Sequence, residues 1–290
     1  MSSFVEQGIY QRTYRAIRRW DFAEDMRNLW RCSTDPYFRP IMTGEWMSSD
    51  MLKKALSSIN DIDYEKWCLS QNEHLRTKAI DQQVLYTVLA EYQTHIFQHQ
   101  GICAEFGVFQ GHSLQKSAQM LPKCQWFGFD SFEGFEQAWG MNNDQYILGK
   151  DAFSLGGKMP DIRLENITLV KGYFSQSLPL FVEGLAHDDH FSFVHIDCDT
   201  FDAVTSIFDH IGERLVPGTI LVMDDLVGII GITDAMKDFY NFVQARNLSF
   251  EWLYSGRGPN EYTVLDRGCV LTHWLFTNRV GMFSAACILT

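Results

Sequence analysis

The hydrophobic pattern of the chain changes near residue 100. Before that point apolar residues recur at helical spacing, and over residues 80–98 one helical face carries Val84, Leu85, Val88, Leu89, Tyr92 and Ile96. An earlier piece, residues 48–59, opens with Ser and Asp, which are typical of a helix start. The spacing predicts a mostly helical N-terminal region over residues 1–98.

Beyond residue 100, short apolar runs alternate with helical segments. The clearest helix is predicted over residues 201–218, where Pro217-Gly218 ends an apolar stripe. Two last apolar runs, residues 250–254 and 282–289, are expected to pair antiparallel. The remaining predicted strands are residues 102–106, 125–130, 167–172, 191–197 and 219–225. Strand and helix in alternation predict an α/β domain over residues 99–290, with helices on both faces of a mostly parallel sheet.

Composition and charge restrict the partners of such a domain. The chain has 290 residues and a formal net charge of −12, which disfavours a nucleic-acid or anionic-membrane surface. The sequence offers neither the apolar core of a signal peptide nor the roughly 18 apolar residues of a membrane span. Its seven scattered cysteines contain no CxxC pair, as is typical of free thiols in a reducing compartment. We therefore expect a cytoplasmic protein.

The first strand of the α/β domain runs into a turn with two glycines. The stretch 104–113, AEFGVFQGHS, ends its apolar run at Glu105 and places Gly107 and Gly111 in the following turn. Ligands of open α/β sheets bind outside the carboxyl ends of the strands, where a bare backbone allows close approach. The turn predicts a nucleotide-like ligand, and the alternative is a glycine-rich turn without one.

The second strand ends in Asp130, 19 residues beyond Gly111. An acid near this offset accepts hydrogen bonds from ribose hydroxyls in dinucleotide-binding folds. We interpret Asp130 as a ribose ligand, with a cap for the following segment as the alternative.

Acidic residues also follow two later strands, at Asp197, Asp199, Asp224 and Asp225. Four carboxylates around one point repel one another unless a cation lies among them. Oxygen ligands without His or Cys support favour Mg²⁺, Mn²⁺ or Ca²⁺ over zinc. The alternative is that these acids cap helices or are solvated.

These pieces resemble those of a known enzyme family. Residues from about 100 to 225 look like a class I S-adenosylmethionine (SAM) methyltransferase, and more narrowly resemble the macrocin O-methyltransferase family, which methylates sugar hydroxyls of antibiotics. The matching pieces, in family order, are EFGVFQGHS, FGFDSFEG, LVKGYFSQSLP, HIDCDTFD and MDD. The resemblance implies the strand order 3-2-1-4-5-7-6 with strand 7 antiparallel, a Rossmann-like sheet under a helical cap, and SAM as cofactor.

The resemblance also implies roles for individual residues. A divalent metal, with Mg²⁺ favoured, would bind Asp197, Asp224 and Asp225, and Asp199 would lie just outside the ligands. For the catalytic base, the mechanism leaves Asp197 and, as the alternative, Asp199. The implied cofactor-binding residues are Glu105, Phe106, Gly107, Gly111, Ser113, Asp130, Ser131, Phe132, Gly172, Phe174 and Asp197.

The chain departs from relatives at a few positions near the site. Thr200 stands where related metal-dependent catechol enzymes place a lysine, so a lysine base is absent. Gln110 and His112 stand where relatives often have arginine and glycine. His195 shares a strand face with Asp197, one pleat deeper, and we interpret it as a packed or supporting histidine rather than as a base.

The expected function is SAM- and metal-dependent methylation of a hydroxyl on a small molecule, such as a sugar or another natural-product diol. The N-terminal helices would cover the acceptor site, with Trp139 as a lid residue, and a homodimer contact is a further role for them. Two alternatives remain within the fold: a metal-independent small-molecule methyltransferase, and a SAM-binding protein without catalysis. An NAD-dependent oxidoreductase would be expected to carry the motif G-x-G-x-x-G after the first strand. This chain has G-x-x-x-G there, which disfavours that class of enzyme.

Overall fold

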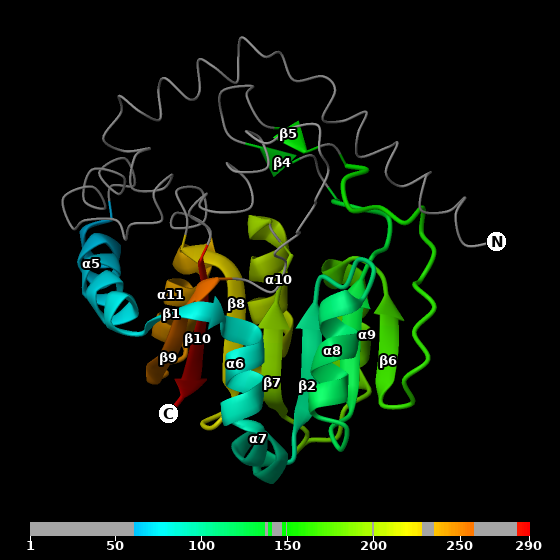
Figure 1. Ribbon diagram of the computed structural model, residues 1–290. Helices are drawn as coiled ribbons and strands as arrows, with labels where there is room; N and C mark the ends of the chain where they lie inside the picture. Colours follow the sequence, from blue (N-terminus) through cyan, green and yellow to red (C-terminus); the bar gives the residue numbers. More distant parts are fainter. Residues whose placement is uncertain are drawn as a thin grey trace, which may run out of the picture.

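The computed structural model describes residues 61–136, 139–140, 147–148, 150–198, 200–227, 235–257 and 283–290. Within these residues an eight-stranded sheet has the order β1-β9-β10-β8-β7-β2-β3-β6 (Figure 1). Its strands are β1 Ala79–Gln83, β2 Ile102–Phe106, β3 Trp126–Asp130, β6 Ile167–Lys171, β7 Phe191–Ile196, β8 Ile220–Val227, β9 Phe250–Arg257 and β10 Phe283–Leu289. The helices are α5 Ile62–Thr77, α6 Val84–Glu91, α7 Gln93–His99, α8 His112–Met120, α9 Phe174–Glu183, α10 Phe201–Ile211, α11 Ala235–Ala245 and the 3₁₀ turn Gly212–Arg214.

The sheet confirms the topology expected from the sequence. Counted from β2 as the first strand, β6-β3-β2-β7-β8-β10-β9 is the order 3-2-1-4-5-7-6. The pairings β2–β3, β2–β7, β3–β6 and β7–β8 are parallel, whereas β10 is antiparallel to both β8 and β9. The predicted antiparallel pair of the last two apolar runs is therefore β9–β10.

The prediction of one helix over residues 80–98 is wrong at its start. Residues Ala79–Gln83 form β1, which pairs parallel with β9 and adds an eighth strand at the edge of the sheet. The backbone N–H of Ser255 on β9 donates to the carbonyl of Lys78 at 3.0 Å. An edge strand offers unpaired backbone groups, so this pairing overrides the helical preference of the segment. The helix begins only at Val84, and the chain divides it into α6 and α7 around Tyr92.

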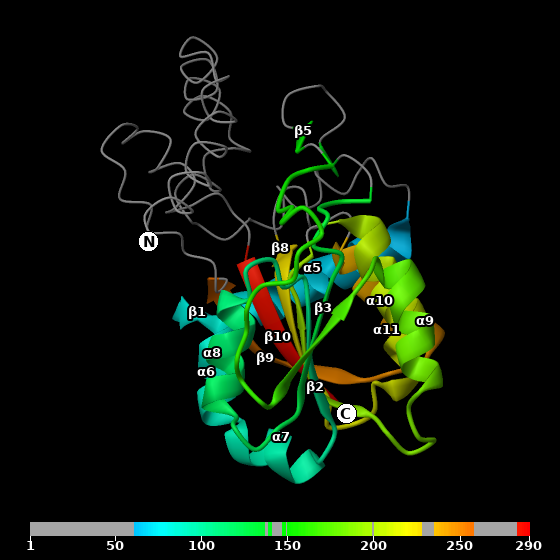
Figure 2. The same cartoon turned by 90° about the vertical axis from the view of Figure 1, so that its right-hand side faces the viewer.

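Two helical layers cover the sheet, as the turned view shows (Figure 2). Buried residues of α5, α9, α10 and α11 form one hydrophobic core with the sheet, and those of α6 and α8 form a second core on the opposite face. The stripe predicted for the helix over residues 201–218 is the buried face of α10, where Val204, Ile207, Phe208 and Ile211 are buried. Burial of that stripe fixes the helix against the sheet.

The N-terminal region is described only in part. Residues 61–98 pack on the sheet through α5, β1 and α6, and the proposed lid over the acceptor site stays a prediction because residues 1–60 lie outside the described part of the chain. The two-residue strands β4 Trp139–Gly140 and β5 Ile147–Leu148 pair beyond the carboxyl ends of the parallel strands (Figure 1). Trp139 therefore lies in β4, but its side chain is outside the description. The domain boundary at residue 98 likewise remains a prediction.

Candidate active site

The glycine turn after β2 packs against the end of β7. Gly107 has φ of 92°, and a Cβ there would lie only 1.7 Å from the carbonyl oxygen of Asp197. Gly111 has φ of 75° at the start of α8, and a Cβ there would lie 2.5 Å from the side chain of Ile162. Gly107 needs glycine for conformation and for space, whereas Gly111 needs it for its left-handed conformation, because the flexible end of Ile162 can shift. The first glycine brings the turn directly beside Asp197, one of the predicted site residues.

Asp130 holds the conformation of this turn. One carboxylate oxygen, Oδ2, accepts from the backbone N–H groups of Val108 at 2.8 Å and Phe109 at 2.7 Å. The other, Oδ1, accepts from the N–H of Phe132 at 2.6 Å. Phe109 and Phe132 have φ of 47° and 56°, a left-handed conformation that costs energy for phenylalanine and that these hydrogen bonds help to hold. The bond to Phe132 is the local cap that the sequence offered as an alternative, and Oδ1 keeps room for one further donor.

Glu105 lies beneath the turn, fully buried. Its Oε1 accepts from the Ser113 hydroxyl at 2.8 Å, and its Oε2 lies 2.9 Å from Nδ1 of His195. Two residues expected to contact the cofactor, Glu105 and Ser113, thus bind each other. A buried carboxylate requires such partners, since an unpaired one is strongly unfavourable away from water.

His195, the partner of Glu105, is also fully buried. Burial by itself lowers the pKa of His195, but its hydrogen bond to Glu105 and the negative charges of Glu105 and Asp197 outweigh that effect, so the pKa lies above its ordinary value. Its second ring nitrogen, Nε2, is buried and has no hydrogen-bond partner among the residues that the structure describes. Such an orphaned nitrogen is uncommon in a folded protein and calls for an explanation.

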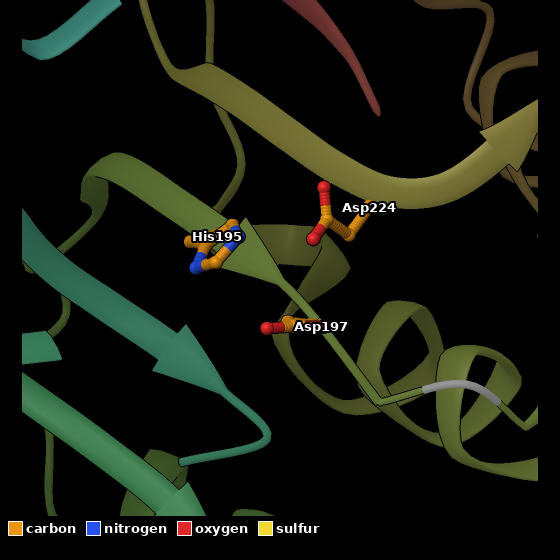
Figure 3. A group of neighbouring side chains, drawn as sticks. All are labelled: His195, Asp197 and Asp224. Carbon is orange, nitrogen blue, oxygen red and sulfur yellow. The ribbon is translucent and has the colours of Figure 1, made fainter. Parts of the chain in front are cut away.

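His195, Asp197 and Asp224 converge at the carboxyl ends of two adjacent parallel strands (Figure 3). His195 is the second-last residue of β7, Asp197 directly follows the strand, and Asp224 lies on β8. One possible ligand atom from each residue lies within 4.8 Å of the others. Asp224 also accepts a hydrogen bond from the Ser284 hydroxyl on β10.

Of the predicted metal ligands, the structure therefore brings Asp197 and Asp224 together. The side chain of Asp225 and the whole of Asp199 lie outside the description, so their roles remain predictions. His195 joins the group, whereas the sequence predicts only a packed or supporting histidine at this position. The sequence contains a signal for this placement, because residues 195 and 197 are two positions apart and side chains at that spacing lie on the same face of a strand.

Tyr86 on α6 is a further residue near the acids that the sequence did not suggest. Burial and the charges of Glu105, Asp224 and Asp197 raise the pKa of Tyr86 to about 12, so its hydroxyl stays protonated at neutral pH. Lys116 on α8 places its Nζ 3.4 Å from the centre of the Tyr86 ring. The contact joins residues of two helices that lie 30 positions apart in the sequence, and no local sequence pattern reveals it.

The other predicted cofactor residues line the strand ends or belong to the core. Phe106 is buried and stacks on Phe129, with ring centroids 4.8 Å apart, and it meets Phe174 edge-on at 5.6 Å. The Ser131 hydroxyl donates to the Gly134 carbonyl at 2.9 Å. Gly172 donates its backbone N–H to the carbonyl of Asp130 at 3.0 Å, which joins the end of β6 to the same turn. Contacts of these residues with a cofactor remain a prediction.

A sequence family matches the part of the chain that contains these features. Residues 104–226 match the family described as a methyltransferase domain. This part of the chain is therefore a methyltransferase domain, on a sheet with the strand order of the class I SAM-dependent fold. The strand order and the glycine turn after β2 agree with this assignment. No curated protein matches the chain.

Solved methyltransferase structures are similar to this chain at low identity. CalS11, a calicheamicin methyltransferase, is 16% identical, with 80% of this chain and 89% of that chain covered and a TM-score of 0.47. The O-methyltransferase NovP is 15% identical, with 58% and 74% covered and a TM-score of 0.42. An O-methyltransferase from Bacillus cereus, in complex with SAH, is 15% identical, with 86% and 99% covered and a TM-score of 0.42. These values are too low to transfer a substrate to this chain.

Proposed function

We propose that the protein is a divalent-metal-dependent O-methyltransferase whose acceptor is a small molecule with a reacting hydroxyl beside a second oxygen. The convergence of Asp197 and Asp224 beside the glycine turn is the observation that supports it most strongly. In this family of folds the turn after the first strand binds the methyl donor. Acids at the neighbouring strand ends are therefore close to the point where an acceptor must be held.

The donor set is suited to a divalent cation. Two carboxylates and an imidazole lie within reach of one another, and Nε2 of His195 is without a hydrogen-bond partner in the described part of the chain. In the proposed site Asp197, Asp224 and Asp225 hold the ion, with Mg²⁺ or Mn²⁺ as the expected metal. When bound, such a metal lowers the pKa of an acceptor hydroxyl and fixes its direction.

The residues of the chain would align the two reactants. SAM already carries an activated methyl group, so rate enhancement depends on holding donor and acceptor in line. The contact between Gly107 and the Asp197 carbonyl ties the donor turn to the acid cluster, which keeps the two binding places in register. A carboxylate oxygen of Asp197 is the proposed acceptor of the hydroxyl proton, with Asp199 as the second candidate.

The cofactor's ribose is proposed to bind at Asp130. Its Oδ1 has one backbone donor, from Phe132, so it can accept a hydrogen bond from one ribose hydroxyl. Two hydrogen bonds to a diol, as the sequence suggested, would need Oδ2 to give up one of its backbone donors. We therefore propose that a single ribose hydroxyl binds Asp130.

The proposed class of acceptor rests on the two motifs that are most specific to one enzyme family. The pieces FDSFEG and LVKGYF resemble those of sugar O-methyltransferases, and a sugar diol supplies the two neighbouring oxygens that a metal site needs. We propose a natural-product sugar or a related diol as acceptor in a cytoplasmic enzyme. In the same proposal, the N-terminal residues cover the acceptor site and contribute a homodimer contact.

Metal dependence decides between this function and its nearest alternative. Enzyme treated with EDTA, and checked metal-free by elemental analysis, should lose turnover of a sugar diol or catechol and regain it with Mg²⁺ or Mn²⁺. The Asp224→Asn variant should lose most activity but still bind SAM in calorimetry, because the acid contacts the acceptor side. Full turnover by metal-free enzyme would establish the metal-independent methyltransferase instead. SAM binding without turnover of any diol would favour a non-catalytic protein.

A further inference from the structure

We propose that His195 is itself a metal ligand through Nε2, and that Glu105 is the residue that positions it. The inference rests on the proposed function, since it concerns the metal of that site. It changes the ligand set from oxygen alone to a mixed nitrogen and oxygen set, and with it the class of metal that binds.

The orphaned nitrogen is the first observation. His195 has no exposed surface, and Nε2 has no hydrogen-bond partner among the described residues. The ring nevertheless lies in the group with Asp197 and Asp224, whose carboxylate oxygens come within 4.8 Å of one of its nitrogens (Figure 3). A metal between these residues would satisfy the one ring nitrogen of His195 that the described residues leave without a partner.

The pairing with Glu105 is the second observation, and it is independent of the acids. Because a carboxylate only accepts, Nδ1 of His195 carries the hydrogen that Glu105 Oε2 receives at 2.9 Å. In the neutral ring the lone pair is then on Nε2, the atom that can bind a metal. Metal-bound histidines commonly donate their other ring nitrogen to a carboxylate in this way.

Ser113 makes the pairing rigid. Its hydroxyl donates to Oε1 of Glu105 at 2.8 Å, so both oxygens of the buried carboxylate are occupied and the group cannot easily rotate. Glu105 and His195 are neighbours on the paired strands β2 and β7. The sheet itself therefore sets the direction of the imidazole.

A nitrogen ligand alters metal preference. Imidazole suits Fe²⁺, Ni²⁺ and Zn²⁺, and the affinity of such a site rises from Mn²⁺ to Co²⁺, whereas Mg²⁺ prefers an all-oxygen shell with several waters. The site should therefore bind Co²⁺ and Mn²⁺ more tightly than Mg²⁺. Without a metal role, His195 and Glu105 would be a buried ion pair that only supports the fold.

Electron spin echo spectroscopy of Mn²⁺ bound to the full chain tests the proposal without relying on activity. Wild-type protein should show a directly bound nitrogen, and its signal should change when the histidines are labelled with ¹⁵N. The nitrogen signal should disappear in His195→Gln and persist in His187→Gln, which removes an exposed histidine from a distant loop. If the His195 variant does not fold, the labelled wild type still decides whether a histidine binds the metal, and loss of the nitrogen signal in Glu105→Gln would assign it to His195.

Co²⁺ calorimetry tests the positioning role of Glu105. The Glu105→Gln substitution keeps the size of the side chain but removes the charge that orients the ring. Loss of such an orienting group lowers metal affinity by roughly 10–100-fold. We expect a loss of that size for Co²⁺ and a much smaller one for Mg²⁺, whereas a purely structural role would change the melting temperature and leave the ratio of the two affinities unchanged.

The outcomes separate this inference from the proposed function. Mn²⁺ bound through oxygen alone would overturn the histidine ligand and leave a metal site of acids intact. A nitrogen signal that survives in His195→Gln would also overturn it, because another histidine would be the ligand. Failure of both Mn²⁺ and Co²⁺ to bind at millimolar concentration would overturn the inference together with the metal-dependent function.

Discussion

Substitution of Gly107 by alanine tests the contact that joins the donor turn to the acid cluster. The new Cβ would lie 1.7 Å from the carbonyl oxygen of Asp197, where real contacts of this kind are at least 3.0 Å. The turn and the end of β7 must therefore separate by more than 1 Å. That movement strains two backbone hydrogen bonds, from Gly107 to the Phe129 carbonyl at 3.0 Å and from Asp197 to the Phe106 carbonyl at 2.8 Å.

The expected loss of stability combines two effects. Each backbone hydrogen bond contributes about 0.5–1.5 kcal/mol, so weakening both costs about 1–3 kcal/mol. Alanine in the left-handed region costs about 1–2 kcal/mol more, because φ of Gly107 is 92°. We expect Gly107→Ala to lower the free energy of unfolding by about 2–5 kcal/mol, and to lower turnover further because Asp197 is displaced.

Gly156 supplies a matched control. It also has a left-handed φ, of 66°, but a Cβ there would meet nothing within 4 Å. Gly156→Ala therefore carries the conformational cost of about 1–2 kcal/mol without the steric one. Urea denaturation of both variants gives the difference, which should be about 1–3 kcal/mol. If the two variants unfold within 0.5 kcal/mol of each other, the turn is not packed against Asp197 and the reasoning is refuted.

Three further predictions concern the cofactor, the N-terminal region and a buried thiol. Asp130→Ala should weaken SAM binding in calorimetry by about 1–3 kcal/mol, since it removes a ribose acceptor and loosens the turn; unchanged affinity would exclude this residue from the cofactor site. Deletion of residues 1–60 should abolish turnover while SAM binding largely survives, and full activity of the shortened protein would rule out the lid. Burial raises the pKa of Cys68 from 9.0 to about 11, so at pH 9 only about 1% of it is thiolate. Alkylation followed by peptide mass spectrometry should then be about 50-fold slower in native protein than in urea, and equal rates would contradict its burial.

Much of the fold could be predicted because it is encoded locally. The runs that became β2, β3, β7 and β8 are short and apolar, and the stripe of α10 recurs at helical spacing. The family resemblance then supplied the order of the strands, which the structure confirms. The segment 79–83 escaped prediction because its strand conformation depends on pairing with β9, about 170 residues further along the chain.

The residues of the candidate site could likewise be predicted only where local sequence encodes them. The sequence alone determined that acids follow two strands and that glycines follow another, because each of these features lies within a few residues of a strand end. Only the tertiary structure decided what those residues face. Glu105 meets His195, 90 residues away, and Gly107 meets the backbone of Asp197. Such contacts depend on which strands are neighbours and on their register, and neither property is written in the periodicity of a single segment.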